Sequence, residues 1–141
     1  MLWQHTKQDA VKNFFPLPND IFSLGLSSGE LAVYSYLLFC EDRKTYQCWP
    51  SYKSIGRAVH MSTNTVRKYV AALEENGLIV TEPTSIITKD GRKRNGSLLY
   101  TIRPIQEAVE LHNQRLLRQL EEATEQMHVA KKLAGSAEHT A

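Results

Sequence analysis

Residues 50–79 read PSYKSIGRAVHMSTNTVRKYVAALEENGLI, and this stretch decides the fold of the chain. Ser51 and Ser62 each precede a helix-forming run, so both are expected to act as helix N-caps. The first helix should end near His60, and the second should run from Ser62 to the residue before Gly77. Two short helices joined by such a tight turn predict a helix-turn-helix.

Apolar residues mark the side of each helix that should face a core. In the second helix they recur at spacings of four and three, which is the period of one helix face. The inward positions are expected at Ile55, Ala58 and Val59 in the first helix and at Val66, Val70 and Leu73 in the second. The opposite side of the second helix is then free to contact another molecule.

The flanking sequence supplies the other parts of the fold. Upstream, Ser27 and Glu30 form a capping box, and apolar residues follow at helical spacing to about Glu41. Downstream, residues 78–80 and 98–102 are rich in β-favouring residues and flank a basic segment with two glycine-containing turns. The predicted fold class is mainly α with a small β-hairpin wing, a winged helix-turn-helix plus a long C-terminal helix.

The domain organisation follows from the sequence after Pro104. Neither glycine nor proline occurs again until Gly135, and apolar residues recur at helical spacing. We expect a winged helix-turn-helix domain over residues 1–103 with an N-terminal extension over 1–26, an amphipathic helix over 104–133 and a flexible tail over 134–141. At about 1.5 Å per residue, a helix of some 30 residues reaches about 45 Å, so part of it should project from a small domain.

Charge is unevenly distributed, although the formal net charge is only +2. Residues 1–50 carry a net −1, residues 51–104 carry +5 and residues 105–141 carry −2. The positive charge is therefore concentrated over the predicted helix-turn-helix and hairpin. This concentration favours a polyanionic partner.

The outward side of the second helix carries side chains that can read base edges. Asn can pair with adenine and Arg with guanine through two hydrogen bonds each, and Thr can offer its hydroxyl or its methyl group. Helical geometry places the predicted base-reading set on this side: Thr63, Asn64, Arg67 and Lys68. We therefore expect this helix to enter the major groove of double-stranded DNA.

Phosphate contacts are expected at two other places. The start of the first helix has free N–H groups and a helix dipole that favour an anion, and its predicted phosphate contacts are Ser51, Tyr52, Lys53 and Arg57. The hairpin tip carries the predicted wing contacts, which are Lys89, Arg92, Lys93 and Arg94. For this basic cluster, a solvated turn without a partner is the alternative.

The stretch quoted above resembles the DNA-binding part of the GntR-type and related bacterial winged-helix families. Together with FFPLPNDIFSLGLSSGELAVYSYLL at residues 14–38, it more closely resembles small helix-turn-helix proteins of Gram-positive bacteria and their mobile elements, including the N-terminal modules of plasmid replication initiators. The resemblance implies DNA contacts from the hydroxyl residues that open the recognition helix. It adds Ser62 and Thr65 to the phosphate-binding set. After the wing the chain departs from the larger regulators, because only the long helix follows.

The long helix has two interpretations. It can pair with a second copy of the chain, or it can pack back over its own domain. A palindromic DNA site calls for a two-fold symmetric protein, and we therefore favour a homodimer. The predicted dimerisation residues are Ile105, Val109, Leu116 and Leu120.

Other classes of function find no support in the sequence. The histidines are not at metal-ligand spacing and no catalytic constellation can be assembled, so we expect neither an enzyme nor a metal or other cofactor. Cys40 and Cys48 lack the paired spacing of a zinc site and are expected to be reduced thiols. No stretch suits a membrane span or an export signal, so we expect a cytoplasmic protein without membrane contact.

The sequence thus predicts a sequence-specific double-stranded DNA-binding protein, and specifically a homodimeric bacterial transcriptional regulator. Two alternatives stay open. One is a replication-initiation or mobilisation accessory protein that binds an origin and recruits a partner protein through the long helix. The other is a winged helix that serves only protein–protein contact.

Overall fold

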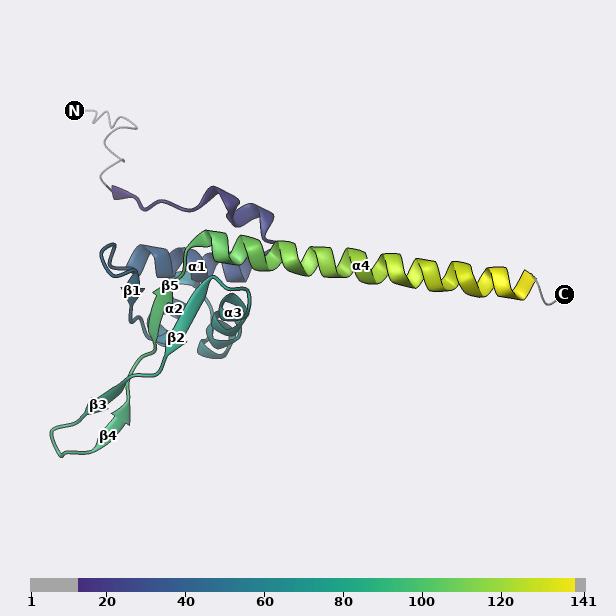
Figure 1. The fold of residues 1–141 in the computed structure, drawn as a ribbon. Helices are drawn as coiled ribbons and strands as arrows, with labels where there is room; N and C mark the ends of the chain where they lie inside the picture. Colours follow the sequence, from purple (N-terminus) through teal and green to yellow (C-terminus); the bar gives the residue numbers. More distant parts are fainter. Residues whose placement is uncertain (1–12, 139–141) are drawn as a thin grey trace, which may run out of the picture.

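A computed structural model describes residues 13–138 of the chain. Three helices form the body: α1 (Ser28–Cys40), α2 (Tyr52–Val59) and α3 (Thr63–Glu75). They pack beside a three-stranded antiparallel sheet in the order β1 (Gln47–Cys48), β5 (Leu99–Ile102), β2 (Ile79–Glu82). A hairpin of β3 (Ser85–Ile87) and β4 (Lys93–Asn95) projects from the body, and α4 (Ile105–Glu138) leaves it as one long rod (Figure 1). The predicted fold class is confirmed.

The predicted helix boundaries around the central turn are confirmed by the caps. Ser27, Ser51 and Ser62 each accept a hydrogen bond from the backbone N–H three residues later, at 3.0–3.2 Å. At the end of α3, Gly77 adopts a φ of +79°, and the Leu78 N–H donates to the Leu73 carbonyl. This is the Schellman motif, which favours glycine at this position, and it leads the chain directly into β2.

The core lies where the helical stripes meet the sheet. Val66, Val70 and Leu73 are at most 3% exposed, as the spacing predicted, and Ile55 is fully buried. The prediction for Ala58 is wrong, because Ala58 is exposed and Gly56 is buried in its place. A Cβ atom on Gly56 would lie only 2.4 Å from the Met61 carbonyl oxygen, so the tight turn after α2 folds over this glycine.

Strand pairing was only partly predicted. The pairing of β2 with β5 is the expected hairpin stem, with Val80 opposite Thr101. Strand β1 was not predicted, because residues 42–50 were expected to be an irregular connection, and it pairs with the outer edge of β5. The short 3-10 helix η2 (Asn19–Ser23), whose Ile21 is buried in the core, was not predicted either.

The long helix α4 has a packed part and a projecting part. Ala108 is buried, and Arg115 donates to the Asn76 side chain at 2.7 Å and to the Glu75 carbonyl at 2.9 Å. Beyond Arg115 nearly every residue of the helix is exposed, and the rod extends away from the body (Figure 1). The helix also continues to Glu138, past the predicted end at residue 133, because a single glycine costs a helix only about 1 kcal/mol.

Within residues 13–138, no helix combines the length and the apolar character that crossing a membrane requires.

Candidate nucleic-acid interface

The outward side of α3 is uncovered and polar. Thr63, Asn64, Arg67 and Lys68 are all exposed, whereas the opposite side of the same helix is fully packed into the core. The geometry that the sequence predicted for these four side chains is therefore present. Because α3 is anchored by its buried stripe and its caps, these side chains extend from a rigid support.

Arg67 has a partner that was not predicted. Its guanidinium carbon lies 5.6 Å from the centre of the Tyr52 ring, at the first residue of α2. A guanidinium over an aromatic face is held by a cation–π interaction, which limits the directions in which the side chain can point. Tyr52, expected to bind phosphate, thus also orients a predicted base-reading residue. Only the packing of α2 against α3 brings the two together.

A shallow hollow joins α2 to the start of α3. It has a volume of about 680 Å³, and its lining includes Lys53 and Arg57 from α2 and Ser62 and Thr63 from the beginning of α3. Two predicted phosphate-binding cations, one predicted phosphate-binding hydroxyl and one predicted base-reading residue therefore share one concave surface. Such a surface suits an anionic backbone that runs past the helix pair.

A second hollow joins α2 to the base of the wing. It is lined by Ser51 and Tyr52 on one side and by residues 95–98 on the other, with a volume of about 320 Å³. Residues 95–98 are not among the predicted DNA contacts. The start of α2 and the base of the wing thus lie on one continuous surface.

The hydroxyl groups predicted to bind phosphate are engaged within the helices. The Ser51 hydroxyl donates to Ser54 at 2.9 Å, and the hydroxyls of Ser62 and Thr65 share a hydrogen bond of 2.8 Å. Because Ser51 and Ser62 cap the helices, they hold the first turns of α2 and α3 in place. The backbone N–H groups of the first two residues of each helix, which do not donate to these cap hydroxyls, are then better available to an anion than the hydroxyls are.

The basic cluster of the wing lies partly outside the turn where it was expected. Lys89 and Arg92 belong to the turn around Gly91, whereas Lys93 and Arg94 are in strand β4. The reason is that residues 85–87 pair with residues 93–95 and so shorten the turn. All four side chains are exposed. Successive side chains of a strand point to opposite faces, so Lys93 and Arg94 lie on different sides of the wing.

The predicted dimerisation residues fall into two groups. Ile105 packs against the core of its own domain and Val109 is half-buried, so the start of α4 follows the alternative interpretation of packing back over the domain. Leu116 and Leu120 are 45% and 64% exposed on the projecting part. Only this second group is free to contact another chain.

Comparisons with known proteins agree with this architecture. Residues 24–79 match the family model of a helix-turn-helix domain, which spans α1, α2 and α3. Among solved structures, a possible transcriptional regulator from Methanosarcina mazei is 15% identical, with 85% of this chain and 84% of that chain covered and a TM-score of 0.51. This similarity supports the shared fold.

Two less similar solved structures are complexes with DNA. Lactococcus lactis ZitR is 18% identical, with 95% of this chain and 89% of that chain covered and a TM-score of 0.38. S. aureus MepR is 14% identical, with 92% and 90% covered and a TM-score of 0.36. Among curated protein sequences, none matches this chain.

Proposed function

We propose that this chain binds double-stranded DNA in a sequence-specific way, with α3 in the major groove. The observation that carries the proposal is the outward side of α3, where Thr63, Asn64, Arg67 and Lys68 stand exposed on a helix whose other side is buried. An α-helix fits the major groove, and these side-chain types match the donor and acceptor pattern of base edges there.

Phosphate contacts on both sides of α3 would fix its position in the groove. Lys53 and Arg57 line the hollow beside the start of α3, where a DNA strand would pass. The wing cations would reach the neighbouring backbone or the minor groove, as a basic hairpin beside a recognition helix does. These contacts set the register of the protein on the duplex and add affinity without adding sequence information.

A salt titration on duplex DNA of mixed sequence tests whether the proposed surface binds phosphate. We expect the logarithm of the binding constant to fall with the logarithm of salt concentration with a slope of about −4 or steeper. Alanine at Lys89, Arg92, Lys93 and Arg94 together should make the slope clearly shallower. The control replaces Arg43 and Lys44, which are exposed between α1 and β1 and belong to neither the proposed DNA surface nor α4, and should leave the slope unchanged. A slope near zero for the unaltered chain would contradict the proposal.

We further propose that two copies pair through the projecting part of α4 to form a homodimeric regulator. The α4 stripe, defined as Leu116, Leu120, Ala123 and Met127, follows one side of this part of the helix at spacings of three and four. All four residues are exposed, and nothing in the described part of the chain covers them. An apolar stripe of this kind is stabilised when a second helix covers it.

The charges beside the stripe favour an antiparallel pair. Glu121, Glu122 and Glu125 precede the centre of the projecting part, and Lys131 and Lys132 follow it. In an antiparallel pair the acidic half of one helix lies beside the basic half of the other, whereas a parallel pair places like charges together.

Light scattering after size-exclusion chromatography tests the pairing. A dimer should have about twice the chain mass of 16.1 kDa, and Leu120→Glu should convert it to the monomer. Replacing both Lys131 and Lys132 by Glu should weaken the dimer, and the additional exchange of Glu121 and Glu122 for Lys should restore it. A monomer at all concentrations, or a dimer that survives Leu120→Glu, would contradict this pairing while leaving DNA binding by α3 open to its own test.

A further inference from the structure

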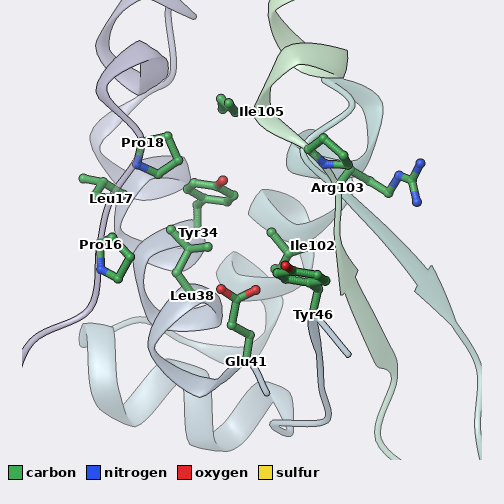
Figure 2. A pocket seen from close by; sticks show the side chains of 11 residues that line it. Pro16, Leu17, Pro18, Tyr34, Leu38, Glu41, Tyr46, Ile102, Arg103 and Ile105 are labelled. Atoms are coloured by element: carbon green, nitrogen blue, oxygen red, sulfur yellow. The ribbon is translucent and has the colours of Figure 1, made fainter. Parts of the chain in front are cut away.

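A hollow with apolar walls lies on the body at the point where α4 begins, among the residues that Figure 2 labels. Its volume is about 470 Å³, within the range of roughly 300–1,000 Å³ that is usual for small-molecule sites. Leu17 and Pro18 from the N-terminal segment form one wall, Leu38 from α1 forms the floor, and Ile102 and Ile105 form the opposite wall. The hollow is formed by segments far apart in the sequence, and none of them belongs to the proposed DNA surface.

One acidic side chain in this hollow lacks a partner. Glu41, directly after the end of α1, points its carboxylate into the hollow (Figure 2). Its Oε2 atom is buried, and no group in the described part of the chain donates a hydrogen bond to it. Burial raises the pKa of this carboxyl above its ordinary value, with Arg43 acting in the opposite direction. A buried carboxylate oxygen without a donor is costly, and a bound donor or cation would remove that cost.

The other charged residue of the lining is already engaged. The Arg103 guanidinium forms a salt bridge with Glu107 at 2.6 Å and points away from the hollow (Figure 2). It therefore leaves the carboxylate of Glu41 as the charge that a ligand would meet.

Two aromatic rings complete the lining. Tyr34 is almost fully buried, and burial together with the nearby Glu41 raises the pKa of its hydroxyl to about 12. Tyr46 is mostly exposed, and its backbone φ is +60°, a value that residues other than glycine rarely adopt. Its N–H donates to the Asp42 carbonyl at 2.6 Å and its carbonyl accepts from the Ile102 N–H at 2.8 Å. These bonds hold an unfavourable backbone conformation that keeps the Tyr46 ring at the hollow.

We infer that this hollow is a binding site for a small organic cation, namely an ammonium group on a mainly apolar body. The apolar walls suit the body of such a molecule, while the Glu41 carboxylate and the faces of aromatic rings are the groups that bind ammonium in proteins. A carboxylate ligand would meet repulsion from Glu41, and a purely apolar ligand would leave Oε2 without a donor. The site stands apart from the proposed DNA surface, so either conclusion can fail without the other.

Calorimetric titration of the full chain with matched pairs of probes tests the site. The probes are 2-phenylethylamine against 3-phenylpropionate, and tryptamine against indole-3-propionate. We expect at least one amine to bind with a dissociation constant below about 1 mM and at least tenfold more tightly than its carboxylate counterpart. No binding of either amine at about 5 mM, or equal binding of amine and carboxylate, would overturn the inference.

Variants locate the binding. Glu41→Gln should weaken amine binding at least tenfold, whereas Glu110→Gln, an exposed position on α4, should leave it unchanged. Tyr46→Gly removes the ring and suits the positive φ, so the fold should persist while amine binding weakens. Amine binding that is insensitive to both Glu41→Gln and Tyr46→Gly would overturn the inference. Binding that appears only after removal of residues 1–12 would also overturn it, because the chain's own N-terminus would then be the occupant.

Discussion

Helix α3 and the projecting part of α4 both present an uncovered face, but the two faces differ in chemistry and in support. The α3 face is polar and basic, and the apolar side chains on the opposite side of the same helix are at most 3% exposed. The α4 stripe is apolar, and no other element of the described chain lies against it. A polar face on a helix that is packed firmly into the core suits a partner that is itself rigid and charged, as DNA is. An apolar stripe on a free rod suits a second helix. This difference predicts that the proposed DNA binding and the proposed dimerisation can be separated by mutation.

The largest effect should come from removing the support of α3. Leu73→Ala takes a fully buried side chain out of the core and should lower the free energy of unfolding by about 2–5 kcal/mol. The same substitution at Leu117, which is 59% exposed on α4 and outside the α4 stripe, should change it by less than about 0.5 kcal/mol. Urea unfolding followed by circular dichroism measures both. Equal losses would show that the projecting part of α4 is packed in solution, and the contrast between the buried side of α3 and the uncovered part of α4 would disappear.

The next largest effect concerns base reading. Asn64→Ala and Arg67→Ala should each lower affinity for the preferred DNA site by about 1–3 kcal/mol and relax the base preference at one position. Arg92→Ala and Lys93→Ala should weaken binding to all sequences alike, because phosphate contacts carry no sequence information. Fluorescence anisotropy with preferred and scrambled duplexes distinguishes the two patterns. Equal losses on both duplexes from all four variants would rule out readout by α3.

A smaller effect should follow from loosening the base of α4. Arg115→Met removes the hydrogen bonds to the Asn76 side chain and the Glu75 carbonyl and should cost about 1–1.5 kcal/mol of unfolding free energy. Arg118→Met, at an exposed position one turn further along, is the control and should cost less than about 0.5 kcal/mol. Hydrogen exchange over residues 105–115 should rise only in the first variant. Unchanged exchange would mean that Arg115 does not anchor the rod.

The smallest predicted effect is a pH dependence at Glu41. Burial raises the pKa of Glu41 above 4.5, so the folded chain holds this proton more tightly than the unfolded chain does. Its contribution to stability is therefore present at low pH and is lost as pH rises from about 4.5 through the raised pKa. The charged or titratable groups near this carboxyl are Arg43, Tyr34 and Cys48. Thermal melts from about pH 4 to pH 7 should show this loss in the unaltered chain and not in Glu41→Gln. Parallel pH profiles would contradict it.

The local parts of the fold could be predicted from the sequence because their causes are local. A serine cap needs only the backbone N–H three residues later, and the stripe of α3 needs only the helical period, so Ser62 and Leu73 were placed correctly. The exposed position of the four predicted base-reading side chains follows from the same period. Their role in reading bases stays a prediction.

The remaining features depend on contacts between distant segments. Strand β1 exists because β5, some 50 residues later, offers it an edge, and Gly56 replaces Ala58 in the core because the turn at Met61 folds over it. The contact between Arg67 and Tyr52 and the hollow around Glu41 arise in the same way. No spacing rule connects such residues, so the sequence alone gave no signal for them.

The measurement that tests the central claim most directly is selection of bound sequences from a random duplex library at about 150 mM salt, followed by titration of the winner against scrambled DNA. The proposal predicts a palindromic winner that is bound at least about a thousandfold more tightly than the scrambled duplex. It also predicts that Asn64→Ala erases part of that preference. Weak binding without enrichment, insensitive to salt and to Asn64→Ala, would contradict readout of DNA by α3 and would favour a winged helix that contacts proteins.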